Sequence, residues 1–202
     1  MKESKGFSDS DGRELVKMAR RSVTEFLRNN SKIDDAAFDS KFDFSSGVFV
    51  TLNKQNSLRG CIGYPLPIKK LSEGLIDAAI SAATHDTRFS PVTIDELDKI
   101  TFEVTVLTPP VEIKVEQPSE YLIEIKVGRD GLIVENPHKS GLLLPQVPIE
   151  YDWNVEEFLG YTCEKAGLEK NAWKDMTTKI SKFQGVIFKE ETPKGKVVRE
   201  QL

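Results

Sequence analysis

The segment at residues 58–63, Leu-Arg-Gly-Cys-Ile-Gly, constrains the fold more than any other stretch of this 202-residue chain. Residues 47–52 before it are rich in β-branched and aromatic types, and the polar run 53–57 separates the two segments. Apolar runs on either side of a short polar connection are typical of a β-hairpin. The pattern therefore predicts a hairpin whose second strand carries one of the two cysteines of the chain.

In such a strand the side chains alternate between two faces, which places Arg59, Cys61 and Gly63 on the same face. A nearby guanidinium favours thiolate over thiol, so this arrangement predicts that Cys61 is more reactive than a free cysteine. Glycine inside a strand often marks the close approach of another backbone or a ligand. Gly60 and Gly63, which flank the cysteine, therefore indicate the floor of a pocket.

Each of these residues also has a structural interpretation. Unpaired cysteine is among the most often buried residue types and commonly packs as a small hydrophobe. A charged residue in an apolar strand needs a partner, and for Arg59 that partner is either a structural carboxylate or a bound anion. The sequence leaves both alternatives open.

Residues 100–107 alternate between apolar and polar side chains, which predicts an antiparallel strand with one buried face. Glu103 lies in the middle of the polar face. We expect it either to pair with Arg59 or to act as an acid/base, and the alternative is a solvent-facing glutamate.

The loop at residues 85–91 carries Asp86 and Arg88, followed by Phe89. One interpretation is a loop held by an internal ion pair, with Phe89 inserted into the core. The other is that this loop forms a wall of a cleft beside Arg59 and Cys61.

Elsewhere the hydrophobic periodicity and the capping signals, at residues 93–96 and 154–157 among others, predict further elements. The expected helices cover residues 8–29, 68–84, 121–125 and 154–166, with a short helix opening at Thr93. The expected strands include residues 142–144 and 179–189.

The segment 58–63 matches the signature hexapeptide of the AMMECR domain family, and four further segments resemble the other motifs of that family in the same order: residues 85–91, 102–107, 128–134 and 141–147. The resemblance covers roughly residues 10–190. Thr87 stands where the family usually has proline. The resemblance implies a two-layer α/β domain with a smaller subdomain and a cleft near the hexapeptide, but no settled activity.

Together these patterns predict one domain over residues 1–202, with an ordered core at about 8–190 and a polar tail at 191–202. We expect an α+β fold in which a two-layer antiparallel or mixed sheet is flanked by helices. A smaller α/β subdomain, whose boundaries the sequence does not define, is expected to form a cleft with the main sheet. A chain of this length can bury a proper core.

Composition narrows the classes of function. The net charge is −4, from 28 basic and 32 acidic residues, and this balance does not favour nucleic-acid binding. There is no apolar run of membrane-spanning length and no signal-peptide pattern at the N-terminus. Two cysteines far apart in sequence suit a reducing compartment, so we expect a cytoplasmic protein.

Motifs for metals and cofactors are also missing from the sequence. There is no paired-cysteine spacing and no His-Glu-x-x-His, and the glycines around Cys61 lack the further glycine or lysine of nucleotide-binding loops. We therefore expect neither a metal site nor a cofactor.

Two functional hypotheses remain, and whether the protein is an enzyme stays open. In the first, Cys61 is the nucleophile or redox thiol of a cleft enzyme, with Arg59 lowering its pKa and Glu103 as a candidate acid/base. A cysteine nucleophile normally needs a base, most often histidine. The only histidines, His85 and His138, are not in signature positions, so Glu103 or Asp86 would have to serve as the base.

In the second hypothesis the protein is a non-catalytic binding or regulatory module. Arg59 and Arg88 would recognise a small anionic ligand or a protein partner through charge-assisted hydrogen bonds. The other candidate ligand-binding residues are Gly60, Gly63, Asp86 and Gln146.

Overall fold

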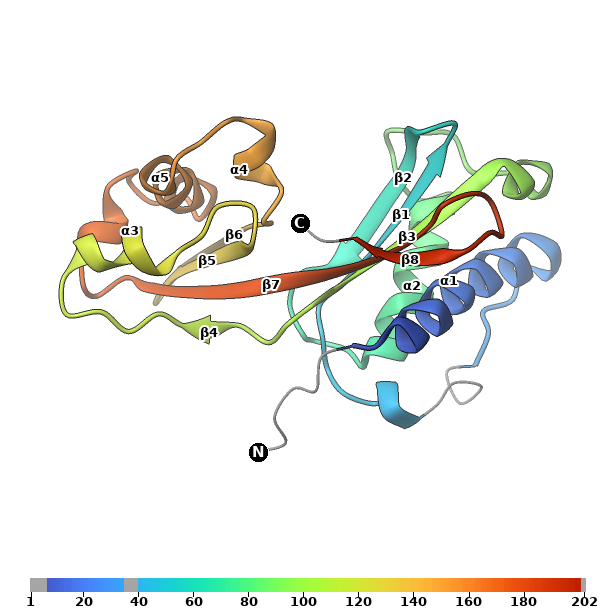
Figure 1. The fold of residues 1–202 in the computed structure, drawn as a ribbon, viewed down its shortest axis with the longest axis horizontal. Helices are drawn as coiled ribbons and strands as arrows, with labels where there is room; N and C mark the ends of the chain where they lie inside the picture. The colour runs from blue at the N-terminus through green and yellow to red at the C-terminus, as the bar shows by residue number, and fades with distance from the viewer. Residues whose placement is uncertain (1–6, 35–39, 201–202) are drawn as a thin grey trace. The chain divides into compact units, whose positions relative to one another are not determined.

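A computed structural model of the chain describes residues 7–34 and 40–200 (Figure 1). These residues divide into two compact units. The larger unit comprises the chain up to Leu107 and the segment from Val186 onward, and the smaller unit comprises residues 108–185. Strand β7 (Lys179–Glu190) contributes its first half to the smaller unit and its second half to the larger one. Each unit has its own hydrophobic core.

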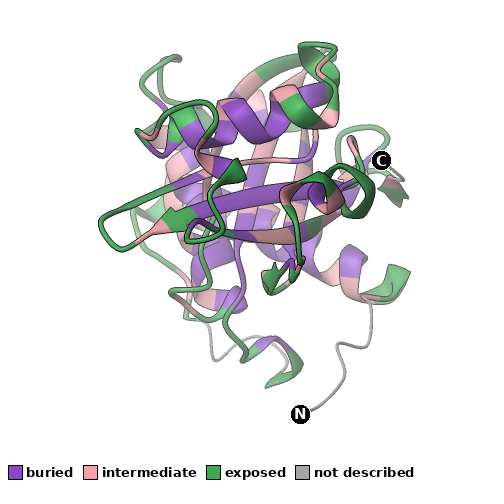
Figure 2. Cartoon of the chain, turned by 90° about the vertical axis from the view of Figure 1, so that its left-hand side faces the viewer, coloured by how far each residue is buried: buried purple, intermediate pink, exposed green. Residues whose placement is uncertain are grey.

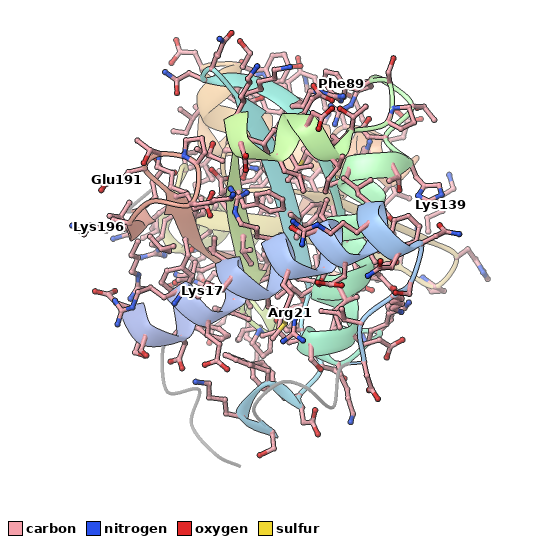
Figure 3. All side chains as sticks on the ribbon, turned by 90° about the vertical axis from the view of Figure 1, so that its right-hand side faces the viewer. Lys17, Arg21, Phe89, Lys139, Glu191 and Lys196 are labelled. Atoms are coloured by element: carbon pink, nitrogen blue, oxygen red, sulfur yellow. The ribbon has the colours of Figure 1, made fainter. Side chains whose placement is uncertain are left out.

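Two long helices, α1 (Asp9–Asn29) and α2 (Leu71–Thr84), belong to the larger unit. Helix α1 begins with a reciprocal capping box between Ser8 and Asp11, which satisfies free backbone amides. Its basic residues Lys17 and Arg21 lie on the exposed side (Figure 3). Helix α2 begins three residues later than the sequence predicts. Its buried face is rich in alanine, so its backbone can lie close to the sheet.

The sheet of the larger unit is formed by β1 (Val48–Lys54), β2 (Ser57–Tyr64), β3 (Ile100–Leu107), the second half of β7, and β8 (Val197–Glu200). The strand order is β2–β1–β3–β7, and β8 pairs with β7. Helices α1 and α2 contact one face of this sheet. Much of this sheet is buried, as the purple parts of the cartoon in Figure 2 show. Its core residues, which pack with those of the helices, include Val48, Val50, Leu52, Phe102, Val104 and Val106.

The predicted hairpin is confirmed. Strands β1 and β2 pair antiparallel around a turn at Gln55 and Asn56, whose φ angles are 53° and 61°. Two consecutive residues with positive φ match the twist of the flanking strands. The register places Cys61 opposite Thr51, and Thr51 opposite Glu103 of β3 on its other side.

In the smaller unit, β5 (Asp130–Asn136) pairs antiparallel with β6 (Lys139–Leu143) and with the first half of β7, which also pairs with β4 (Val111–Glu112). The helices are α3 (Tyr121–Glu124), α4 (Val147–Glu150) and α5 (Val155–Lys165). Helix α5 packs on β5 and β6. It starts at the predicted capping box of Asn154 and is followed by Gly167 with a φ of 72°.

Short 3-10 helices complete the described structure: η2 (Ser40–Phe42), η3 (Ile94–Lys99), η4 (Pro118–Glu120) and η5 (Ala172–Lys174). The capping box predicted between Thr93 and Glu96 is present and opens η3. The structure confirms an α+β fold with antiparallel strand pairing. The cleft between the main sheet and the smaller subdomain stays a prediction.

The C-terminal segment differs from its expected form as a polar tail. Residues 197–200 form β8, which pairs antiparallel with the end of β7. Val197 packs against the core of the larger unit. This apolar contact and the strand pairing explain why the segment is ordered despite its polar neighbours.

Candidate functional site

Cys61, Thr51 and Glu103 form a row across three neighbouring strands of the larger unit. They lie at matching positions in β2, β1 and β3. Their side chains are on the sheet face opposite the core, because Val50, Leu52 and Phe102 occupy the alternate positions and are fully buried. All three residues of the row are half-buried.

Thr51 links the other two members of this row. Its Oγ1 lies 3.3 Å from the Sγ of Cys61. On its other side Thr51 is the register partner of Glu103, and it lowers the pKa of that carboxyl group. The sequence analysis named Cys61 and Glu103 but missed Thr51. The signal was present, since the hairpin register and the strand period together place Thr51 beside Cys61.

Burial is the main influence on both ionisable groups of the row. It raises the pKa of the Cys61 thiol, while the hydrogen bond from Thr51 and the positive charge of Arg88 act in the opposite direction. Burial and the negative charge of Glu200 raise the pKa of Glu103, and Lys189 opposes them. The site therefore favours a neutral thiol beside a carboxyl group of increased basicity.

Asp86 and Arg88 cap the outer edge of β2 at Cys61. The Cys61 N–H donates to Asp86 Oδ2 at 2.9 Å, and Arg88 Nη2 donates to the Cys61 carbonyl oxygen at 3.3 Å. Arg88 also donates to both Asp86 oxygens through Nε and Nη2, at 3.0 and 2.8 Å. The Arg88 guanidinium holds the pKa of the buried Asp86 far below its usual range.

This loop shows features of both interpretations made from the sequence. The internal ion pair is present, and the loop also lies beside Cys61. Phe89, however, is only half-buried and is not part of the core (Figure 3). Its ring lies against Arg88, with the guanidinium carbon 5.5 Å from the ring centroid.

Arg59 has a structural partner, and that partner is Glu96 rather than Glu103. Its Nη2 lies 3.0 Å from Glu96 Oε2, and Nη1 donates to the Ser90 carbonyl oxygen at 2.8 Å. Glu96 also accepts from Lys54, and these hydrogen bonds lower its pKa to about 2. The cation that lowers the pKa of Cys61 is Arg88, which corrects the expected role of Arg59.

The two glycines of the hexapeptide allow close packing. A Cβ atom at Gly60 would lie 2.1 Å from the Ala82 carbonyl oxygen of α2. A Cβ atom at Gly63 would lie 2.4 Å from the Phe49 ring and from the Val48 carbonyl oxygen. Both positions therefore exclude a side chain for reasons of packing within the larger unit.

The remaining candidates belong to other elements of the chain. Gln146 belongs to the smaller unit, where it precedes α4 and is half-buried. His138 is exposed in the same unit, and the exposed His85 lies 2.7 Å from the Thr84 hydroxyl through Nδ1. The second cysteine, Cys163, is a free thiol buried in the core of the smaller unit.

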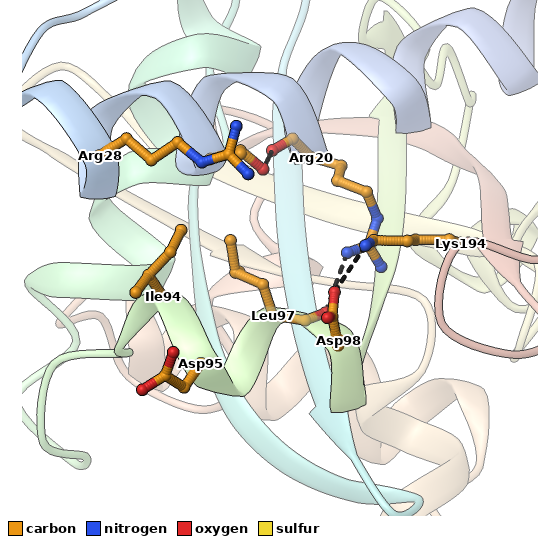
Figure 4. A pocket seen from close by; sticks show the side chains of 8 residues that line it. Arg20, Arg28, Ile94, Asp95, Leu97, Asp98 and Lys194 are labelled. Atoms are coloured by element: carbon orange, nitrogen blue, oxygen red, sulfur yellow. Dashed lines mark hydrogen bonds and ion pairs between the residues drawn. The ribbon is translucent and has the colours of Figure 1, made fainter.

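A hollow of about 330 Å³ lies elsewhere in the larger unit, between α1 and η3 (Figure 4). Arg28, Asp95 and Lys194 are among its lining residues, and the Lys194 ammonium pairs with Asp98. None of the residues predicted as site residues lines this hollow.

Within residues 7–34 and 40–200, no cluster of three or more His, Cys, Asp or Glu side chains is arranged to hold a metal ion. No helix in the same part of the chain has the length and apolar character required to cross a bilayer.

Comparison with known proteins gives consistent matches over almost the whole chain. The family model described as AMMECR1 matches residues 16–188. A protein of Thermococcus onnurineus is 52% identical over 200 residues, which cover 96% of this chain and 97% of that protein. Protein MJ0810 of Methanocaldococcus jannaschii is 48% identical over 194 residues, covering 95% and 96%.

A solved structure is also similar. The crystal structure of the uncharacterized protein PH0010 from Pyrococcus horikoshii matches with a TM-score of 0.83 and 48% sequence identity, covering 97% of this chain and 99% of that one. The names of these relatives state no activity.

Proposed function

The chain belongs to the AMMECR1 family, and from the geometry of its own residues we propose that it is an enzyme with Cys61 as nucleophile. The observation that supports this most directly is the row of Cys61, Thr51 and Glu103, in which the Thr51 hydroxyl lies 3.3 Å from the thiol and Thr51 pairs with Glu103 on the neighbouring strand. A nucleophile linked to a base by hydrogen bonds is the usual arrangement for covalent catalysis.

In the proposed step, the Cys61 sulfur attacks the carbonyl carbon of an acyl substrate. An S–C bond forms while the π electrons of the C=O bond move to oxygen. When the C=O bond forms again, the bond to the leaving group breaks, the leaving group departs with that electron pair, and Cys61 is left as a thioester. The thiol proton passes to the Thr51 hydroxyl, whose own proton passes to the Glu103 carboxylate. The raised pKa of Glu103 suits it as a base, because general bases work best with a pKa near the operating pH.

Arg88 is the group that would stabilise the resulting oxyanion. Its side chain is 55% exposed, and its charge already acts on the Cys61 thiol. Fixed positive charge near a developing oxyanion lowers the barrier to acyl transfer. Asp86 holds Arg88 in place through two hydrogen bonds to the guanidinium, and is a positioning residue in this account.

The test is acylation by p-nitrophenyl acetate, followed by peptide mapping with mass spectrometry. We expect acetyl-Cys61 in the folded protein and unmodified Cys163, which is buried and serves as an internal control. The Cys61→Ser variant should lose the fast phase of p-nitrophenolate release. If Cys61 is acylated only after unfolding, the proposal is wrong.

A second candidate is a binding module for a small anionic ligand. It is favoured by one observation: Nη1 of the exposed Arg88 makes no hydrogen bond to any described residue. It would be free to bind a carboxylate or phosphate. Arg59 forms an ion pair with Glu96, so it does not contact the ligand in this second proposal. Inorganic phosphate is the probe, and its binding should be lost in Arg88→Ala but retained in Cys61→Ala.

A further inference from the structure

Three aromatic side chains of the smaller unit form a continuous stack. The rings of Tyr151 and Trp153 lie 5.0 Å apart at an interplanar angle of 17°, and those of Trp153 and Tyr161 lie 4.1 Å apart at 19°. At the Tyr161 end, the Lys170 ammonium lies 4.0 Å from the ring centroid. This aromatic stack therefore already holds a cation at one end.

The Tyr151 end of the aromatic stack is open. Tyr151 is 64% exposed, and in the described part of the chain Trp153 is the only ring stacked on it. No cation of the described residues lies over the Tyr151 ring. One face of an electron-rich ring is thus available to a group from outside the chain.

The charged neighbours of Tyr151 in the sequence have one sign. Glu150 and Asp152 flank Tyr151 in sequence, are exposed, and form no side-chain hydrogen bond or ion pair with the described residues. Residues 147–157 contain four acidic residues and no lysine or arginine. A cation that binds the ring face would therefore also be attracted by two nearby carboxylates that have no partner among the described residues.

We propose that the open face of Tyr151, with Glu150 and Asp152, binds an arginine or lysine side chain on a basic segment of a partner protein. The exposed Ile149, with 60% of its surface accessible, favours a chain segment over a small free cation. A segment covers this apolar neighbour while its cation contacts the ring. The inference is independent of the chemistry proposed for Cys61.

The test is a titration of the protein with an amidated peptide of five Arg-Gly repeats. Binding is followed by calorimetry and by intrinsic tryptophan fluorescence, to which Trp153 and the buried Trp173 both contribute. We expect Tyr151→Leu to weaken binding about three- to thirtyfold, the range for the loss of a cation–π contact, and Tyr151→Phe to retain it. Phe44→Leu is the matched control, because it removes another exposed ring, in the larger unit.

The double variant Glu150→Gln/Asp152→Asn should also weaken binding and reduce its salt dependence. Circular dichroism will verify that each variant is folded. Equal peptide affinity of Tyr151→Leu and wild type would overturn the proposal, as would equal binding of a Glu-Gly repeat peptide. If tetramethylammonium binds as tightly as the peptide, the site binds a small cation, and the proposal that it binds a segment of a partner protein is wrong.

Discussion

The Thr51 hydroxyl lies 3.3 Å from the Cys61 thiol, across the two strands of the β1–β2 hairpin. The same residue lowers the pKa of Glu103, which lies opposite Thr51 on β3. The signature hexapeptide therefore supplies only one member of the row. The antiparallel sheet adds the other two, from segments before and after it in the chain.

Replacing Thr51 with valine tests this link directly. The hydrogen bond from Thr51 lowers the pKa of Cys61, so its removal should raise that pKa further. At pH 8, alkylation of Cys61 by iodoacetamide should slow by about two- to tenfold, the effect of one hydrogen bond. Thr105→Val, on the same face of β3, is the matched control and should leave the rate unchanged.

Arg59→Ala should destabilise the protein without changing the titration of Cys61. The substitution removes the ion pair with Glu96 and the hydrogen bond to the Ser90 carbonyl oxygen. We expect a loss of about 1–3 kcal/mol in the free energy of unfolding, measured with urea. The pKa of Cys61 is obtained from the pH dependence of its alkylation rate. If this pKa increases in a variant that is still folded, Arg59 is the group that activates the thiol.

Gly60→Ala should be strongly destabilising, because the new Cβ would lie 2.1 Å from a backbone carbonyl oxygen of α2. Backbone shifts of this kind typically cost about 1–3 kcal/mol or more. Gly74→Ala is the control, since its nearest contact is a Val48 methyl group at 3.2 Å. Thermal unfolding should show a much larger decrease in Tm for Gly60→Ala than for Gly74→Ala.

Stability should fall in acid partly through Glu96. Its pKa in the folded protein is about 2, below the ordinary value of 4.5. Between pH 2 and pH 4.5 the unfolded chain binds more protons than the folded protein. The stabilisation that Glu96 contributes to the folded protein is therefore complete above pH 4.5 and is lost as the pH falls towards 2. Measured by urea unfolding, the free energy of unfolding of Glu96→Gln should decrease less steeply between pH 4.5 and pH 2 than that of the wild type. An identical pH dependence of the two proteins would contradict this role of Glu96.

Local features of the structure could be predicted from the sequence. The β1–β2 hairpin, the capping boxes at Thr93 and Asn154, and the alternation of β3 all follow from patterns within a few residues. The same holds for the ion pair of Asp86 and Arg88, which are two residues apart.

Features that depend on tertiary packing could not be predicted in the same way. Glu96, the partner of Arg59, lies 37 residues further along the chain, and its sequence pattern indicates only a helix cap. Phe89 remains half-buried because its ring contacts Arg88 instead of the core. Strand β8 is too short to be recognised without β7, its pairing partner.

The most direct test of the proposed relay is a comparison of two reagents on Glu103→Gln. The negative charge of Glu103 contributes to the raised pKa of Cys61, so its removal should make iodoacetamide alkylation at pH 7 faster. Acylation by p-nitrophenyl acetate, if Glu103 is the base, should become about 100-fold slower or more. A decrease in acylation with an increase in alkylation is the predicted result. If both reactions become faster, or acylation is unchanged, Glu103 is not the base and the relay through Thr51 is wrong.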